Sequence, residues 1–301
     1  MKQKIVITGA NGLLGQKLVK LFLQNGVDFI ATSKGANRNE NCPSERFVSL
    51  DVTNEQEVNE VLMEVRPTAI IHTAAMTNVD QCESDHDGCD RLNVDAVEFL
   101  WNAAKKMNCH FQLLSTDFIF DGEKGNYSEE DPANPVSYYG VSKLKAEQIL
   151  IDDSSSDNWS IVRTILVYGT GSNLSRSNLV LWAMATLPQG GEMNIVNDQF
   201  RALTWADDLA QGCWLIVLKG QKGIFHISGK DTMSVFDWVK RIARHFDWAD
   251  TNVHPISSLG LNQPAKRPPK TGFSIQKAQN LLGYTPESFE KTLDLLKEEL
   301  S

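Results

Sequence analysis

The chain has few cysteines and no apolar run long enough to cross a membrane. Its five cysteines are an odd number without Cys-x-x-Cys spacing, so we expect no disulfide framework. The longest apolar runs, such as 213–218, are far shorter than the roughly 20 residues of a membrane span. The first residues lead directly into a strand pattern rather than the apolar region of a signal peptide. We therefore expect a cytoplasmic protein.

The chain also has fewer basic than acidic residues. Lys and Arg number 29 against 38 Asp and Glu, which gives a net charge of -9, and no Lys/Arg run is longer than a pair. Such a chain has no general attraction for nucleic acid or anionic lipid, so we expect neither as a partner. The 42% apolar and 22% charged residues are typical of a globular protein. Its 301 residues correspond to about two domains.

Short apolar or β-branched runs alternate with amphipathic stretches over the first 170 residues. The runs 69–75 and 111–115 are nearly all apolar, which is typical of parallel strands covered on both faces. Thr53-x-x-Gln56 has the form of a capping box. The alternation predicts an α/β fold, a Rossmann-type doubly wound parallel sheet. We expect strands at 5–8, 27–32, 47–50, 69–75, 111–115 and 160–167, and helices at 14–24, 53–66, 88–107 and 138–151.

The pattern is looser after Gly169. We expect helices near 176–187, 206–218, 234–246 and 288–300, and strands at 193–196 and 223–227. We therefore divide the chain into an NAD(P)-binding Rossmann domain, residues 1–170, and a smaller C-terminal α/β substrate-binding lobe, residues 171–301. We expect the lobe to be partly interleaved with the sheet, so the boundary is soft.

A glycine-rich turn, Thr8 to Gly15, joins the first strand to the first helix. Gly9 permits a tight turn, Gly12 lets the backbone approach a pyrophosphate, and Gly15 lets the helix pack on the strand. The helix N-terminus adds amide donors and a positive dipole end. A Walker A loop is excluded because no Lys-Ser/Thr pair follows Gly15. The turn predicts a dinucleotide site with contacts at Gly9, Asn11, Gly12, Leu13, Leu14 and Gly15.

The end of the second strand bears on which dinucleotide binds. An acidic residue there would bind the ribose hydroxyls of NAD, whereas a basic one accommodates the 2′-phosphate of NADP. This chain has Ser33, Lys34 and then Arg38, with no acidic residue before Glu40. NADP(H) is therefore favoured, and NAD(H) remains an alternative in which Lys34 and Arg38 are solvated loop charges. At the end of the third strand, two further residues are placed to meet the adenine: Asp51 and Val52.

Tyr139 and Lys143 are four residues apart, which places a phenol and an ammonium on one helix face. A nearby cation favours phenolate, so we expect Lys143 to lower the pKa of Tyr139, and Lys143 could also hold the nicotinamide ribose. Tyr138 is a rival, but its fourth following residue is Ser142. Alternatively, Tyr139 and Lys143 are two residues at the start of a helix that share no function.

The strand that ends at Ser115 and Thr116 carries hydroxyls to the carboxyl edge of the sheet, where ligands bind in this architecture. Thr116 could donate a hydrogen bond to a substrate carbonyl. Ser115 could serve instead, but side chains alternate along a strand, so we expect only one of the two to face the cleft.

With these motifs, the chain resembles the extended short-chain dehydrogenase/reductase (NAD-dependent epimerase/dehydratase) superfamily, and within it the dTDP-4-dehydrorhamnose reductase (RmlD-like) group. The resemblance covers most of the chain. Its motifs are Thr8–Gly15, His72–Ala75 with Val79-Asp80-x-x-Glu83, Ser115–Gly122, Tyr139–Lys143, Val162–Thr164 with Val167–Gly169, Val196–Phe200, Asp207–Ala210 and Arg267-Pro268.

This resemblance implies hydride transfer from the pro-S face of NAD(P)H to the 4-keto carbon of a nucleotide-linked 6-deoxysugar. Tyr139 would protonate the developing alkoxide, Thr116 would polarise the carbonyl, and Lys143 would anchor the ribose. Four further residues would lie along or support the cofactor: Thr73, Ala74, Ala75 and Asn93. The superfamily often dimerises through helices that here would include residues near 95–105 and 138–150, which implies a possible homodimer.

The branches of the superfamily differ chemically. Sugar 4,6-dehydratases need an Asp-Glu pair after the Thr, but here Phe118 follows Asp117. Epimerase-reductases that make GDP-fucose use a Cys just after the active-site Ser, and none is present there. Simple reduction needs no second acid/base pair, so it suits this sequence.

Departures from the group cluster in the substrate half. Ile165-Leu166 replaces Ser-Trp, Arg201–Thr204 replaces Gly-x-Pro-Thr, and 175–178 are polar where the group is apolar. Arg201 could bind a diphosphate bidentately or form an exposed salt bridge. Candidate substrate contacts are Thr116, Asn173 and Arg201.

Two other functions stay open: another epimerase or ketone reductase of the superfamily, and a non-catalytic cofactor-binding regulatory subunit. Cys82, His86 and Cys89 match no structural zinc spacing, so we predict no metal site.

Overall fold

A seven-stranded sheet forms the centre of the computed structural model, which describes residues 3–300. All its strand pairs are parallel, in the order β11-β6-β5-β4-β1-β2-β3. The strands are β1 Lys4–Thr8, β2 Asp28–Ser33, β3 Phe47–Ser49, β4 Ala69–His72, β5 His110–Thr116, β6 Trp159–Thr164 and β11 Gly223–His226. The order reverses between β1 and β4, which places a ligand crevice at the carboxyl ends of these strands. The predicted Rossmann-type sheet is confirmed.

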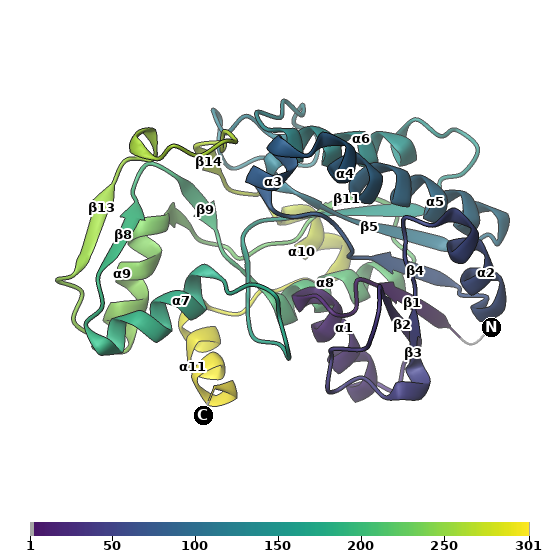
Figure 1. The fold of residues 1–301 in the computed structure, drawn as a ribbon, viewed down its shortest axis with the longest axis horizontal. Helices are drawn as coiled ribbons and strands as arrows, with labels where there is room; N and C mark the ends of the chain where they lie inside the picture. Colours follow the sequence, from purple (N-terminus) through teal and green to yellow (C-terminus); the bar gives the residue numbers. More distant parts are fainter. Residues whose placement is uncertain (1–2, 301) are drawn as a thin grey trace.

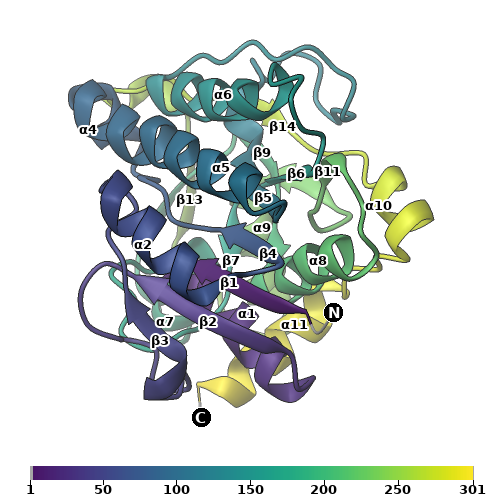
Figure 2. The same cartoon turned by 90° about the vertical axis from the view of Figure 1, so that its right-hand side faces the viewer.

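Helices cover both faces of the sheet, as Figure 2 shows. One face carries α1 (Leu13–Gln24), α8 (Ala206–Leu218) and α10 (Gln276–Leu282). The other carries α2 (Glu55–Val65), α5 (Ala96–Lys106) and α6 (Tyr138–Ile151). Successive side chains of a strand point to opposite faces, so in β1 Ile5 and Ile7 enter the first core and Val6 the second.

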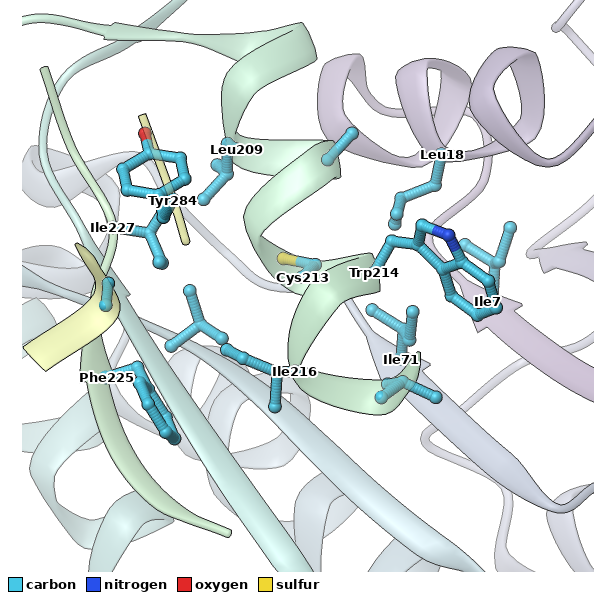
Figure 3. Packing of buried hydrophobic residues seen from close by; sticks show 14 of the residues in the cluster. Ile7, Leu18, Ile71, Leu209, Cys213, Trp214, Ile216, Phe225, Ile227 and Tyr284 are labelled. Atoms are coloured by element: carbon cyan, nitrogen blue, oxygen red, sulfur yellow. The ribbon is translucent and has the colours of Figure 1, made fainter. Parts of the chain in front are cut away.

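Helix α8 follows residue 170 in the chain but belongs to the sheet. Its Trp214 faces Leu18 of α1, and its Leu209, Cys213 and Ile216 pack in the same core as Phe225 of β11 (Figure 3). The C-terminal half of the chain therefore supplies both an edge strand and two covering helices of the central sheet.

The remaining elements form a lobe with its own core beyond the carboxyl edge of the strands (Figure 1). Its helices are α7 Leu179–Thr186, α9 Val235–His245 and α11 Phe289–Glu299. Its strands form three small sheets: β12 Thr232–Ser234, β9 Phe200–Ala202 and β14 Lys270–Thr271; β13 Val253–Ile256 and β8 Met193–Val196; β10 Thr204–Trp205 and β7 Val167–Tyr168. Among residues 3–300, no helix combines the length and hydropathy that a membrane span requires.

Three details differ from the sequence-based expectations. Helix α2 is capped by Asn54, whose side chain accepts from the Glu57 amide, because Thr53 donates instead to Asp51. The predicted helix 88–107 is divided into α4 (His86–Asp90), a π-helical turn (Arg91–Asp95) and α5. A short helix that was not predicted, α3 (Val79–Ser84), precedes them. The predicted strand 160–167 breaks after Thr164, where Leu166 has a positive φ of 32°. Single-turn π segments often occur at functional sites.

Candidate active site

The glycine turn has the geometry that a close-approaching ligand requires. Gly9 has a φ of +72°, and a Cβ there would lie 2.6 Å from the backbone nitrogen of Ala74. A Cβ on Gly15 would lie 2.4 Å from the Gly9 carbonyl oxygen, so α1 packs directly on the turn. At Gly12 a Cβ would approach only the Gly9 oxygen, at 3.2 Å. The side of the turn at Gly12 is therefore open to a ligand.

The first turn of α1 suits an anion. Gly12 is its N-cap residue and provides no side-chain cap, and no acidic residue lies in the first turn. The amides around Leu13 and Leu14 and the positive end of the helix dipole thus face the opening at Gly12. This cradle fits the pyrophosphate of a dinucleotide.

Asn11 organises the loop that follows β2. Its buried side chain donates to the Ala36 carbonyl at 2.9 Å and accepts from the Arg38 amide at 2.8 Å. Arg38 itself is exposed. The predicted cofactor residue Asn11 therefore acts on the loop that carries the basic residues, and Ser33 ends the strand before that loop.

Lys34 and Asp51, both predicted near the adenosine, pair with each other at 2.7 Å. The Asp51 hydrogen bond raises the pKa of Lys34. Burial alone would raise the pKa of Asp51, but its hydrogen bonds from Lys34 and Thr53 outweigh burial and lower it. Val52 is buried in the core on the α2 face of the sheet.

Asn173, a predicted substrate contact, lies at this same loop. Its side-chain amide donates to the Arg38 carbonyl at 3.3 Å and to the Glu40 carboxylate at 3.1 Å. The structure thus places Asn173 beside the predicted adenosine end and does not bring it together with Thr116.

Hydrogen bonds join the segment after β4 to both the glycine turn and helix α6. The Thr73 hydroxyl donates to the Thr8 carbonyl at 2.7 Å, and the next two residues, Ala74 and Ala75, are half-buried. Asn93, in the π-helical turn, exchanges two hydrogen bonds with the backbone of Met76. Its amide also donates to the Ser142 hydroxyl at 3.0 Å.

Thr116 and Tyr139 come together where β5 and α6 meet. Thr116 ends β5, and Tyr139 lies in the first turn of α6, which Ser137 caps. Tyr139 is only 8% exposed, and burial raises its pKa, although a hydrogen bond with Thr116 opposes the rise. The expectation that Lys143 lowers the pKa of Tyr139 is wrong because burial dominates.

The two rival residues face elsewhere. The Ser115 hydroxyl donates to Glu147 at 2.5 Å, so the alternation along β5 leaves Thr116 beside Tyr139. The Tyr138 hydroxyl donates to Asp90 at 2.9 Å, and its ring stacks on His86 at 3.5 Å. The arrangement favours Thr116 and Tyr139 over Ser115 and Tyr138.

Lys143 lies one turn beyond Tyr139 and is 3% exposed. Burial lowers its pKa to about 8, and the negative charge of Glu147 opposes this fall. A lysine with this pKa is still mostly an ammonium at pH 7. Thr116, Tyr139 and Lys143 thus provide two hydroxyls and a cation at one edge of the sheet.

Arg201 does not form the exposed salt bridge that we considered, because it is 4% exposed. Its guanidinium donates to the carbonyls of Phe200 at 2.7 Å and Pro268 at 2.6 Å, and lies 3.9 Å from Asp117. Burial raises the pKa of Asp117, with Arg201 and Thr271 opposing it. The guanidinium is therefore held among protein groups of the β9–β14 junction.

Three residues of the site region received no role from the sequence. Asp80 accepts two hydrogen bonds from Arg267, at 2.9 and 2.6 Å, which joins α3 to the segment before β14. Glu83 accepts from the Tyr138 amide at 3.0 Å, at the start of α6. The spacing Asp80-x-x-Glu83 and the Arg267-Pro268 pair were the available signals, but neither predicts which groups they meet.

The three residues considered as metal ligands, Cys82, His86 and Cys89, do not converge on one point. His86 stacks on Tyr138, whereas Cys82 and Cys89 are buried beside Tyr139. In residues 3–300, no three His, Cys, Asp or Glu side chains are grouped to hold a metal ion.

Comparison with known proteins identifies the family. A family model described as "RmlD substrate binding domain" matches residues 3–301. A dTDP-4-dehydrorhamnose reductase of Aggregatibacter actinomycetemcomitans is 30% identical over 306 residues, which cover 96% of this chain and 97% of the relative. A methionine adenosyltransferase 2 subunit beta of Bos taurus is 28% identical over 270 residues, covering 87% of this chain and 78% of the relative.

A solved structure extends the similarity to three dimensions. The dTDP-4-dehydrorhamnose reductase from Bacillus anthracis str. Ames, in complex with NADP, has a TM-score of 0.85 and 28% identity, and the match covers 99% of this chain and 100% of that chain. Since the family model spans the glycine turn, helix α6 and the C-terminal lobe alike, this chain belongs to the RmlD family of extended short-chain dehydrogenases/reductases.

Proposed function

We propose that this protein is an NADPH-dependent reductase of a nucleotide-linked 4-keto-6-deoxysugar, with dTDP-4-dehydrorhamnose as the first substrate to test. The observation that carries the proposal is the placement of Thr116, at the end of β5, beside the Tyr139 phenol and one helical turn from the buried Lys143. The 30% identical relative, which is a dTDP-4-dehydrorhamnose reductase, supports the same reaction and substrate.

NADPH supplies the hydride when it is bound. The open turn at Gly12 and the uncapped start of α1 would hold its pyrophosphate. Arg38 and Lys34 would face the 2′-phosphate, and Lys143 would bind the nicotinamide ribose. The NADP complex of the Bacillus anthracis enzyme supports this choice of cofactor, and NAD(H) is the alternative.

The proton comes from Tyr139. A ketone becomes an alcohol when its carbon accepts a hydride and its oxygen accepts a proton, so the acid must still hold its proton at neutral pH. Burial raises the pKa of Tyr139, which keeps the phenol protonated. The Thr116 hydroxyl lies beside the phenol and donates its one proton to Asp117 at 3.0 Å; with substrate bound it would donate to the carbonyl oxygen instead. The positive charge of Lys143 stabilises the phenolate that is left behind.

The first test is NADPH oxidation by the purified protein over a panel of nucleotide-linked 4-ketosugars. Tyr139→Phe should lose about 100-fold or more in kcat, the usual effect of general acid catalysis. Tyr138→Phe is the matched control, because that hydroxyl bonds to Asp90 and not to Thr116. No NADPH oxidation on any ketosugar, or full activity in Tyr139→Phe, would contradict the proposal.

A regulatory subunit without activity is the second candidate, because a relative named as a subunit of another enzyme, methionine adenosyltransferase 2 subunit beta, is also similar over most of the chain. The two functions differ in one outcome. A regulatory subunit would bind NADPH and oxidise none of it with any ketosugar, and Tyr139→Phe would change nothing.

We also propose that the protein is a cytoplasmic homodimer, which forms through α5 and α6. These helices line a groove with Lys105, Lys145, Gln148 and Ile149 at the surface, over the buried Trp101. The five buried free thiols suit a reducing compartment. Light scattering should give twice the mass of 33.6 kDa, and a charge placed at Ile149 should reduce that mass to the monomer's.

A further inference from the structure

A buried carboxylate lies on the catalytic helix one turn beyond Lys143. Glu147 is 0% exposed, and three hydrogen-bonding atoms converge on it. Arg163 of β6 donates from Nε at 3.0 Å and from Nη2 at 2.6 Å, and Ser115 of β5 donates at 2.5 Å. A buried carboxylate stays ionised only when it is paired and hydrogen-bonded in this way. The site therefore contains a fixed negative charge that the sequence analysis did not use.

Lys143 needs such a charge. It is buried, and an ammonium that leaves water is disfavoured relative to the neutral amine. The titratable groups packed around it come from β4, α3, α4 and its own helix: His72, Cys82, Cys89, Tyr139 and Glu147.

Of these groups, only Glu147 carries a full negative charge at neutral pH. His72 is neutral, because burial and the charge of Lys143 lower its pKa to about 3. Its Nδ1 bonds to the Thr8 hydroxyl at 2.7 Å. Burial raises the pKa of Tyr139, so the phenol is neutral as well. Cys82 and Cys89 lie beside each other as free thiols. The Cys82 thiol lowers the pKa of Cys89 to about 7, so Cys89 carries only part of a negative charge at neutral pH.

We propose that Glu147 is a positioning residue that keeps Lys143 in its ammonium form, with Arg163 and Ser115 holding the carboxylate in place. Glu147 and Lys143 are four residues apart on α6, so their side chains share one face of the helix. Burial lowers the pKa of Lys143 to about 8, and Glu147 contributes the largest opposing effect. The inference rests on the proposed function, in which the ammonium binds the ribose and stabilises the Tyr139 phenolate.

The direct test is a titration of Lys143 in the free protein by NMR of labelled lysine side chains, with the resonance assigned through Lys143→Arg. In Glu147→Gln, which keeps the shape of the side chain, the pKa of Lys143 should fall by about one pH unit or more. Glu290→Gln is the matched control, because it also removes a carboxylate paired with an arginine, Arg241, but in the C-terminal lobe.

A merely structural role for the network predicts something else. Arg163→Lys keeps a cation beside the Glu147 carboxylate but loses the two-pronged geometry of the guanidinium, so the pKa of Lys143 should hardly change, whereas a structural role predicts that both variants move it alike. If Glu147→Gln does not fold, Glu147→Asp keeps the charge but withdraws it by one methylene, and a smaller fall is expected.

In Glu147→Gln, the alkaline limb of the pH profile of kcat/KM should move to lower pH by the same amount as the pKa of Lys143. An unchanged titration of Lys143 in folded Glu147→Gln would overturn the inference. Because the titration needs neither cofactor nor ketosugar, it separates failure of this inference from failure of the proposed reaction.

Discussion

Replacement of Lys143 by methionine should make the protein more stable and inactive. The buried ammonium is retained at an energetic disadvantage: burial lowers its pKa from 10.5 to about 8. At about 1.4 kcal/mol per pH unit, this fall corresponds to about 3 kcal/mol of lost stability at neutral pH. Methionine has a similar length and no charge, so Lys143→Met should recover much of that energy. Sites that carry function often reduce stability in this way.

The direction of the pKa shift determines how this stability gain changes with pH. The folded pKa lies below the unfolded one, so the destabilisation is fully present below about pH 8 and fades as the pH rises toward 10.5. Urea unfolding at pH 7.0 and 9.5 should therefore show a stability gain for Lys143→Met that shrinks by about half at the higher pH.

Lys145→Met is the matched control. Lys145 lies on the same helix with its side chain 43% exposed, in a surface pair with Asp90. Its replacement should change the free energy of unfolding by no more than about 1 kcal/mol. If Lys143→Met is less stable than the parent at pH 7.0, or its gain is the same at both pH values, the assignment of a charged buried Lys143 is refuted.

Three further predictions concern the cofactor and the substrate lobe. Gly9→Ala should abolish the thermal stabilisation by NADPH, and it should lower the free energy of unfolding more than Gly26→Ala does. Both glycines have a positive φ, but only at Gly9 would a Cβ lie 2.6 Å from a backbone nitrogen. Equal losses in the two variants would show that no close approach exists. Arg38→Ala should weaken NADPH binding about tenfold in calorimetry and leave NADH binding unchanged; an equal loss for both would remove the 2′-phosphate role. Asp80→Asn should raise KM for the ketosugar more than it lowers kcat, because it removes the negative charge and one of the two acceptor oxygens that bind Arg267 and join α3 to the substrate lobe. A fall in kcat alone would contradict that role.

The central sheet could be predicted because its strands are marked by short, local sequence patterns. Alternating apolar runs gave six of the strand positions, and the glycine turn gave the position of the crevice. The contribution of α8 to the sheet was harder to predict, since only the packing of residues such as Cys213 and Ile216 shows that this late helix returns to the first half of the chain.

The active site divides in the same manner. Tyr139 and Lys143 are four residues apart in the sequence, so their shared face was predictable. The pKa of Tyr139 was not, because it depends on burial under α3 and α4, which sequence spacing does not reveal. Glu147 and Arg163 meet only because α6 packs over β6, and a carboxylate on a helix is ordinarily expected to be solvated.

The central claim is that this chain transfers the pro-S hydride of NADPH to the 4-keto carbon of a nucleotide sugar and a proton from Tyr139 to its oxygen. The most direct measurement uses (4S)-deuterated NADPH with dTDP-4-dehydrorhamnose and follows the sugar nucleotide by mass spectrometry. We predict one deuterium in the reduced sugar with the parent protein and with Tyr138→Phe, and almost none with Tyr139→Phe. Unreduced sugar with the parent protein, or reduced sugar without deuterium, would contradict the claim.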